Sequence, residues 1–285
     1  MRPLTFLAAL TSVCLITQAA SAQEQKDPAS TEPEILDGMS YGSLSTRSSD
    51  RKLIFTFLLG GESRPGYFGS DDNIGIVKAS PNLAALSFGR LELGDEVDAF
   101  DDDPNDFPLG VVVSTSFRFI SDREAADYPE LAGLEDLDSA LEVGGKFGYV
   151  WPSVEVFADV RYGVTGHKSW VGELSSYYVA RPADKLVLRV GPRLLFGTDR
   201  YADTYFGVSP AESVTSAYPA YSAGGGLVSA GIEVIGTYQL GRQWWLEGRA
   251  RWDKLQGDAA NSPIVSDDEM LTVSLGIRRA FVLDF

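Results

Sequence analysis

The sequence predicts an all-β protein, a transmembrane antiparallel β-barrel of about 12 strands, with 10 as the alternative count. Three observations predict it: apolar and polar residues alternate along many short runs, the last run ends the chain on Phe285, and the N-terminus has the pattern of a secretory signal. Strands with one face toward lipid and the other toward a polar lumen alternate in this way. Alternation alone leaves a soluble β-sandwich open, because a sandwich also alternates and keeps its apolar face inside.

The final run, residues 271–285, predicts the closing strand of the barrel. Apolar side chains occupy most of its odd-numbered positions, and Phe281, Leu283 and Phe285 lie on this face. The pattern resembles the C-terminal signal by which bacterial outer-membrane proteins are recognised for insertion. We therefore expect these three residues to act as an assembly signal, with the barrel-assembly machinery as a partner during insertion.

The N-terminal part divides into two segments before the barrel. Residues 1–22 combine a positive start, a short apolar core and the small residues Ala20-Ser21-Ala22, which is typical of a cleaved secretory signal peptide. Residues 23–50 are rich in Pro, Glu, Ser and Thr and predict a mobile segment, so that residues 51–285 form the barrel. The one cysteine, Cys14, lies in the signal. The net charge of -16 argues against a nucleic-acid partner.

The internal strands are predicted from alternation, most clearly at residues 109–119. Large aromatic residues near strand ends, such as Trp151 and Trp170, are typical of the interfacial girdles of barrels. A tight turn is predicted at residues 181–185, but in a 12-stranded barrel these residues fall at the outer end, where long loops are expected. If the runs on either side of residues 197–201 belong to one long strand, a count of 10 strands is possible. The other clear runs are residues 141–149, 154–164, 186–196 and 244–253, and the weaker ones are residues 53–60, 74–79, 83–93, 171–180, 201–208 and 227–240.

Three stretches resemble the MltA-interacting protein and OmpV family of outer-membrane proteins: residues 60–72, residues 199–210 with their continuation to residue 227, and residues 257–265. Gly66 departs from the family pattern, which usually has Asp after the proline. Glycine and proline set tight turns, and Asp or Ser cap backbone groups there, so we expect these stretches to be loops. The family-motif residues are Pro65, Tyr67, Gly69, Ser70, Asp71 and Asp72 in the first stretch, and Tyr205, Phe206, Gly207, Ser209 and Pro210 in the second.

The resemblance implies a location in the bacterial outer membrane and contact with outer-membrane lipid. One member of the family is described as a scaffold that joins a murein lytic transglycosylase to a murein synthase. The resemblance therefore implies a non-enzymatic scaffold of the cell envelope, with these two enzymes as partners.

Charges of both signs are predicted to face the lumen, and they leave two functions open. They could line a narrow channel for small solutes, or they could pair and close it. Ten to twelve strands leave a narrow interior, in which close charges of opposite sign favour pairing. We therefore expect a closed or nearly closed barrel whose loops bind partners. The predicted lumen charges are Glu142, Lys146, Glu155, Asp159, Arg161, Arg189, Arg193, Glu233, Glu247, Arg249 and Arg251.

The sequence predicts no catalytic, cofactor or metal site. His167 is the one histidine, and although Ser169 and Asp159 are near it, the local sequence is typical of a turn at a strand end. The acidic run at residues 101–106 lacks the glycine and the distal glutamate of a calcium-binding loop, so a solvated loop is favoured. We expect the protein not to be an enzyme.

Overall fold

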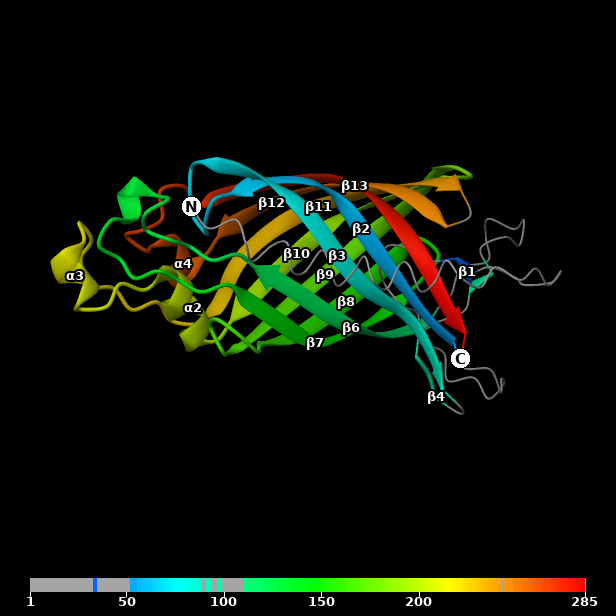
Figure 1. The fold of residues 1–285 in the computed structure, drawn as a ribbon, viewed down its shortest axis with the longest axis horizontal. Coiled ribbons are helices and arrows are strands. Elements are labelled where there is room, and N and C mark those ends of the chain that lie inside the picture. Colours follow the sequence, from blue (N-terminus) through cyan, green and yellow to red (C-terminus); the bar gives the residue numbers. More distant parts are fainter. Residues whose placement is uncertain are drawn as a thin grey trace. The chain divides into compact units, whose positions relative to one another are not determined.

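The computed structural model describes residues 33–34, 52–88, 91–93, 97–98, 110–241 and 243–284. Residues Pro33–Phe285 form one unit, in which antiparallel strands wind into a barrel (Figure 1). The predicted signal peptide, residues 1–22, lies outside the described residues. So do Phe285, the acidic run at residues 101–106 and, except for residues 33–34, the predicted mobile segment, residues 23–50.

Ten long strands of the described residues form the wall of the barrel. Their order in the sheet is β3-β2-β13-β12-β11-β10-β9-β8-β7-β6, and all neighbours pair antiparallel. The strands are β2 (Lys52–Pro65), β3 (Asn73–Phe88), β6 (Gly110–Ile120), β7 (Ala140–Val150), β8 (Val154–Gly163), β9 (Trp170–Ala183), β10 (Leu186–Gly197), β11 (Gly226–Gly241), β12 (Trp244–Leu255) and β13 (Glu269–Asp284).

The C-terminal strand has partners on both sides, as the closing strand of a barrel does. β13 pairs with β12 on one side and with β2 on the other, from Lys52 opposite Asp284 to Ser63 opposite Val273. In the described part of the chain no ladder joins β3 to β6, although the two strands approach each other, so the sheet is open at this seam. The short β4 (Leu91–Leu93) pairs with β3, and β1 (Pro33–Glu34) pairs with β5 (Val97–Asp98) in a separate two-stranded sheet.

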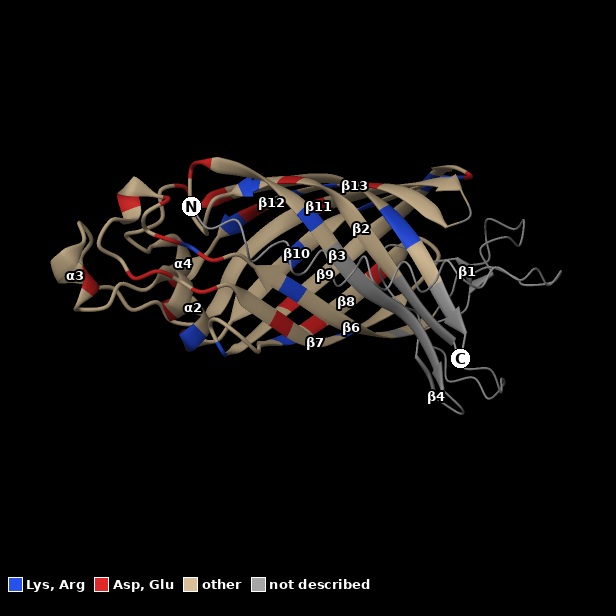
Figure 2. Cartoon of the chain, viewed as in Figure 1, with Lys and Arg blue, Asp and Glu red and all other residues tan. Residues whose placement is uncertain are grey.

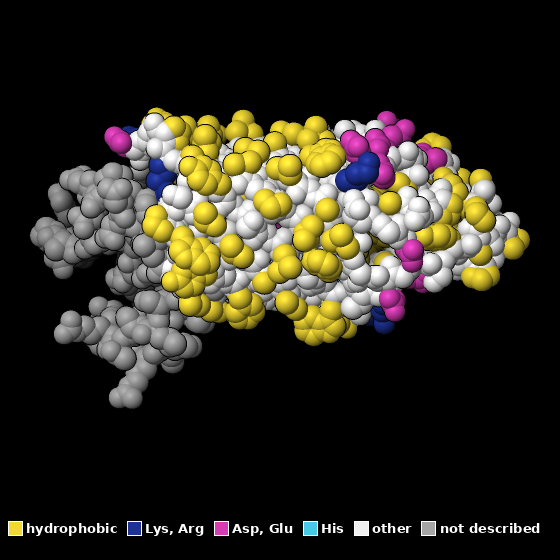
Figure 3. Space-filling model, turned by 180° about the vertical axis from the view of Figure 1, so that it is seen from behind, with side chains coloured by type: hydrophobic (Ala, Val, Ile, Leu, Met, Phe, Trp, Pro, Cys, Tyr) yellow, Lys and Arg dark blue, Asp and Glu magenta, His cyan; other side chains and the backbone are white. Residues whose placement is uncertain are grey.

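The direction of the side chains distinguishes the barrel from a sandwich. Outward positions carry exposed apolar residues, such as Phe147, which is 53% exposed, and Leu275, which is 59% exposed. Inward positions carry buried polar residues, and Glu142 and Arg189 are both 0% exposed. Figure 3 shows apolar side chains spread over the wall, with most of the acidic ones toward one end. The apolar face is therefore the outer one, as a lipid-facing wall requires.

Connection lengths and aromatic side chains define the two ends of the barrel. Residues 151–153 and 184–185 form tight turns at one end, whereas the other end carries the long loops 66–72, 121–139, 164–169, 198–225 and 256–268. Trp151 and Trp244 are exposed near the short turns, and Trp170 and Trp252 are exposed near the long loops. Two aromatic girdles thus flank the apolar wall, as predicted.

The ten long strands agree with the lower predicted count, and three predicted runs explain the difference. Residues 74–79 and 83–93 belong mainly to one strand, β3, which continues through Pro81. Since β3 is the last long strand at the seam, a proline is tolerated there. Residues 201–208 were a wrong strand prediction, because residues Asp199–Phe206 form helix α2. The alternative of one long strand through residues 197–201 was also wrong, because β10 ends at Gly197 and helix α2 follows it.

The short helices of the described residues all lie in the long loops. Helix α2 buries Tyr201 and Tyr205, and also Ala202 and Phe206, which are pairs spaced by four residues. This spacing places all four side chains on one face of a helix. None of the described helices is long and apolar enough to cross a membrane. The others are η1 (Pro129–Leu131), α3 (Glu212–Thr215) and α4 (Gly257–Ala260).

The outward apolar face can be tested at Leu275, which lies near the middle of β13. We expect Leu275→Arg to lower the free energy of unfolding in lipid vesicles by about 2–4 kcal/mol, because the charge must leave water at the membrane midplane. Tryptophan fluorescence during urea unfolding measures this change. Leu275→Ala is the matched control that removes the side chain without adding charge. A Leu275→Arg protein as stable as this control would contradict a lipid-facing wall.

Candidate functional site

The interior of the barrel holds a network of paired charges. Each of the eleven charged residues predicted to face the lumen has an ion-pair partner. The partners come from strands β6 to β13, and Figure 2 shows basic and acidic residues interleaved on neighbouring strands. The charges therefore join the strands across the interior instead of remaining free.

Arg161 is the centre of the network on β8. Its Nε lies 3.0 Å from an oxygen of Glu142, its Nη1 lies 3.1 Å from Asp159, and its Nη2 lies 3.3 Å from Glu173. Its Nη1 also donates to the hydroxyl of Ser116, at 3.2 Å. One guanidinium thus connects carboxylates from β7, β8 and β9. Because Arg161 is 4% exposed, these partners replace the water that the charge has lost.

Glu173 connects this centre to a second one at Arg193. The Nη2 of Arg193 lies 2.7 Å from Glu173, and its Nη1 donates to both oxygens of Asp253, at 2.7 and 2.9 Å. Asp253 is also paired with the Nε of Arg251, at 2.9 Å. Toward the short turns the pairs continue, with Arg189 next to Glu155 and with Glu247 between Arg249 and Arg278.

His167 is a buried member of the same network. Its Nε2 lies 3.2 Å from Glu142, and its Nδ1 lies 2.8 Å from the hydroxyl of Ser169 and 3.3 Å from the backbone nitrogen of Ser169. These contacts fit an Nδ1 that accepts from Ser169 and an Nε2–H that donates to Glu142. Asp159 is paired with Arg161 and Lys146. The His167 ring also fills the space against Gly163, where a Cβ would lie 2.4 Å from it. The histidine therefore fixes the β8–β9 loop.

The three family-like stretches meet in one cap of loops at the end opposite the short turns. The ring of Phe68, in the first stretch, packs edge-on against Tyr205 of the second at 5.1 Å, and it also contacts Phe206. The third stretch joins them, because Ser262 donates to the carbonyl of Phe206 at 2.6 Å and Tyr221 donates to the carbonyl of Asp258 at 2.7 Å. The sequence predicted loops, but residues 60–65, which include Pro65, are the end of strand β2, and residues 199–206 form helix α2. The structure brings the three stretches into mutual contact.

At two positions of the first stretch the structure explains why the residue is glycine. Gly69 has a φ of +87°, and its carbonyl accepts from the backbone of Ser266 and Asp267. A Cβ at Gly69 would lie 2.6 Å from Val265, so a larger residue would push the third stretch away. At Gly66, a Cβ would lie 2.6 Å from the ring of Tyr128. In this chain Tyr128 occupies the space that the usual aspartate of the family would need.

The family-motif residues divide into buried and exposed ones. Tyr67, Ser70, Tyr205 and Phe206 are buried, and Ser70 exchanges hydrogen bonds with the backbone of Asp72. The buried members pack inside the cap, so their main role is structural. The more exposed members are Asp71, Asp72, Ser209 and Pro210, while Pro65 and Gly207 are half-buried and Gly69 is buried. Within the assembly signal, Phe281 is half-buried on β13.

Glu212 joins two of the long loops. Its carboxylate accepts from the backbone nitrogen of Glu135 at 2.9 Å and from that of Ser209 at 2.8 Å. Although burial acts to raise the pKa of Glu212, these backbone donors hold the pKa below its ordinary value. A carboxylate with a lowered pKa stabilises the folded state above its ordinary pKa, and this contribution is lost as the pH falls through the lowered value. Glu212 therefore stabilises the cap at neutral pH.

A cavity of about 80 Å³ lies under the cap, at the upper end of the interior. Its lining includes Arg64, Arg118, Arg123, Arg193 and Arg251. The sequence predicted that Arg193 and Arg251 face the lumen, but it gave no signal for Arg123, which lies in a loop. No group of three or more potential metal ligands is close enough to hold a metal ion in the described ranges.

Replacement of Arg161, the centre of the network, is expected to destabilise the folded barrel strongly. We expect Arg161→Gln to lower the free energy of unfolding by about 3–5 kcal/mol, because it leaves the buried Glu142 and Asp159 and the half-buried Glu173 without their shared partner. Urea unfolding of the folded protein in detergent measures this change. The matched control is Arg200→Gln on α2, an exposed arginine, for which we expect a change within about 0.5 kcal/mol. Equal stability of the two variants would contradict a network that stabilises the barrel.

The chain is similar to several known outer-membrane proteins. YiaT, a candidate outer-membrane protein of Escherichia coli (strain K12), is 28% identical over 112 residues, which are 39% of this chain and 45% of YiaT. The chain thus matches less than half the length of that relative.

Three solved structures are similar over most of the chain. Neisserial surface protein A has a TM-score of 0.29 and 8% identity, over 80% of this chain and 97% of that one. An outer-membrane channel from Pseudomonas putida F1 has a TM-score of 0.39 and 13% identity, over 90% and 100%. The translocator domain of NalP from Neisseria meningitidis has a TM-score of 0.34 and 11% identity, over 96% and 98%.

A family model described as MltA-interacting protein MipA matches residues 59–281. The match begins in the first strand of the wall, ends in the last and includes all three loop stretches of the cap. Since it spans far more than half of the sequence, the chain belongs to the MltA-interacting protein MipA family, and it is a β-barrel of the bacterial outer membrane.

Proposed function

We propose that this protein is a non-enzymatic scaffold of the outer membrane, which holds proteins of murein synthesis and turnover at the membrane. The observation that carries the proposal is the pairing of the interior charges. A path for polar solutes needs charged groups that are free to meet water and solute, whereas these groups are engaged with one another. The outer surface and the two ends then remain as the parts that meet other molecules.

The nature of the partners rests on the family. Its description names an interaction with MltA, and the motif resemblance adds a murein lytic transglycosylase and a murein synthase as partners. Barrels of this type place their short turns toward the periplasm and their long loops outside the cell. Because murein lies in the periplasm, these partners would meet the short-turn end, while lipid surrounds the wall.

The geometry around the one histidine supports a non-enzymatic role. His167, Ser169 and Glu142 are in contact, but all three are buried, and neither His167 nor Ser169 lines the cavity. Glu142 is held by Arg118 and Arg161. A nucleophile and base must reach a substrate, whereas this group is enclosed by other side chains, among them Tyr201 and Tyr205 of α2.

A narrow solute channel is the second candidate. The cavity in the upper interior favours it, because it is a polar space under the loops. The continuous pairing below this cavity favours the scaffold.

Photo-crosslinking at both ends of the barrel tests the scaffold. A photoreactive residue in place of Ser153 or Asp184 probes the short-turn end of the full-length protein in cells, and one in place of Val214 or Ser222 probes the loop end. We expect a lytic transglycosylase or a murein synthase to be captured from Ser153 or Asp184, with mass spectrometry as the readout. The loop-end positions are matched controls, since they are equally exposed. Capture of neither enzyme from the short-turn end would count against the scaffold.

A further inference from the structure

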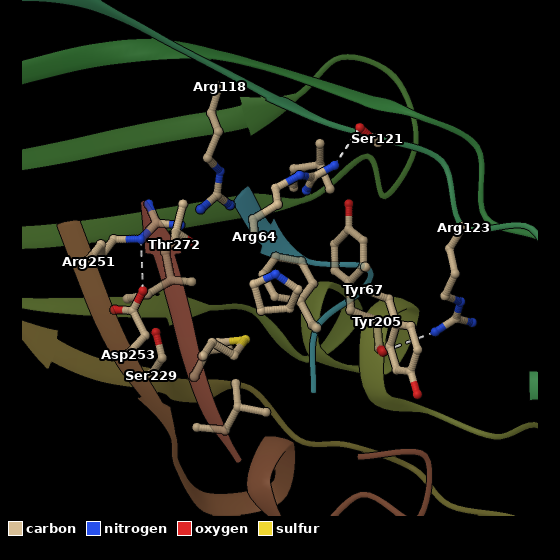
Figure 4. A pocket seen from close by; sticks show the side chains of 18 of the residues that line it. Arg64, Tyr67, Arg118, Ser121, Arg123, Tyr205, Ser229, Arg251, Asp253 and Thr272 are labelled. Carbon is tan, nitrogen blue, oxygen red and sulfur yellow. Dashed lines mark hydrogen bonds and ion pairs between the residues drawn. The ribbon is translucent and has the colours of Figure 1, made fainter. Parts of the chain in front are cut away.

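The cavity under the cap, here called the arginine pocket, is unusually basic. Five arginines line it, and Asp122 and Asp253 are its only acidic lining residues in the described chain. In Figure 4, Arg64, Arg118 and Arg251 enter from different strands, with Tyr67 between them and Arg123. This basic pocket stands out in a chain whose net charge is -16. The arginines therefore concentrate positive charge at one interior place.

Three of the five arginines share a small number of carboxylates. Arg118 is paired with Glu142, at 2.5 Å, although Glu142 also serves Arg161 and His167. Arg193 and Arg251 share Asp253, and Arg193 also pairs with Glu173, which in turn serves Arg161. The carboxylates are thus each divided among several cations. Positive charge remains in excess around the pocket.

The other two arginines have only neutral partners in the part of the chain that the structure describes. Arg64 donates to the hydroxyl of Ser121 at 2.7 Å, and Arg123 donates to the carbonyl of Tyr205 at 3.5 Å. No carboxylate forms an ion pair with either of them among the described residues. Arg123 is 7% exposed, and burial lowers its pKa, which Glu212 and Asp136 oppose from a distance. A buried guanidinium without a counter-charge is costly, so this arrangement favours an anion that supplies one.

Unused hydrogen-bond donors point to the same conclusion. The Nε atoms of Arg64, Arg118 and Arg193 are buried and have no hydrogen-bond partner. Buried donors without partners are rare because each costs the free energy of its lost hydration. The hydroxyls of Ser229 and Thr272 also line the pocket, and they can donate to a ligand oxygen. The pocket thus offers donors and charge, which are what an oxyanion accepts.

The size of the pocket limits the ligand. A water molecule needs about 15 Å³ of such space, so 80 Å³ holds about five atoms of that size. Guanidinium groups match the oxygens of carboxylate and phosphate in geometry. We propose that the arginine pocket binds a small oxyanion, a phosphate or a compact carboxylate, through Arg64, Arg118 and Arg251, with Arg123 adding positive charge from the other side of Tyr67. The site is independent of the scaffold role, since it lies at the opposite end from the short turns.

Isothermal titration calorimetry of the full chain in detergent tests the pocket. Inorganic phosphate and acetate are titrated separately at constant ionic strength, with sodium chloride as the reference titration, because salt screens unspecific charge effects. We expect saturable heat with a stoichiometry of one for phosphate, acetate or both, and none for chloride. Binding of phosphate alone identifies a phosphate group as the ligand, and binding of acetate alone identifies a carboxylate.

Arg64→Gln and Arg123→Gln are the test variants, because neither change leaves a carboxylate without its ion pair. Arg64→Gln is expected to weaken binding about tenfold or more, as the loss of a charged hydrogen bond does. Arg123→Gln removes a positive charge on the other side of Tyr67 and is expected to weaken binding less. Arg200→Gln removes the same charge from the exposed face of α2, outside the pocket lining, and should bind as the unchanged protein does. Circular dichroism confirms that each variant is folded. No saturable heat with either anion, or undiminished binding by both test variants, would overturn the proposal.

Discussion

Charge buried in a narrow barrel is the constraint on which the rest of this structure depends. Ten strands leave little room for water inside, so a charged side chain there must find a partner of opposite sign. Arg161 and Arg193 meet this need by reaching carboxylates on neighbouring and distant strands, with Glu173 common to both. The same contacts that satisfy the charges also fill the interior. Pairing and closure are therefore one physical effect.

The loop cap completes this arrangement at one end. Its core is aromatic and aliphatic, and α2 inserts Tyr201, Tyr205 and Phe206 between the barrel rim and the neighbouring loops. Tyr201 also accepts a hydrogen bond from Arg118, at 3.0 Å, which connects the cap to the charge network. The three family-like stretches thus supply the side chains that pack the cap together. The arginine pocket lies at the level where cap and network meet, and there the pairing is incomplete.

Much of the fold follows from the sequence, because the period of two and the identity of the polar face determine the direction of each side chain. The charged residues of the lumen, such as Glu142 and Arg189, could be predicted because they alternate with apolar residues along their strands. Helix α2 was missed because aromatic residues favour strands, and only burial shows that the spacing of Tyr201 and Tyr205 matters. Strand β3 was predicted as two strands because a proline, Pro81, interrupts it. A proline is tolerated inside this strand because the strand lies at the seam, and the sequence does not show that position. Arg64 and Arg123 could not be assigned to one pocket, since only tertiary folding brings a strand end and a distant loop together.

Planar-bilayer recording of the full-length protein tests the central claim, that paired charges and the loop cap close the interior. The account predicts no steady unitary currents from the purified, folded barrel, because its interior charges are engaged with one another. Steady unitary currents from the same preparation would contradict the closed interior and would shift the function to a solute channel.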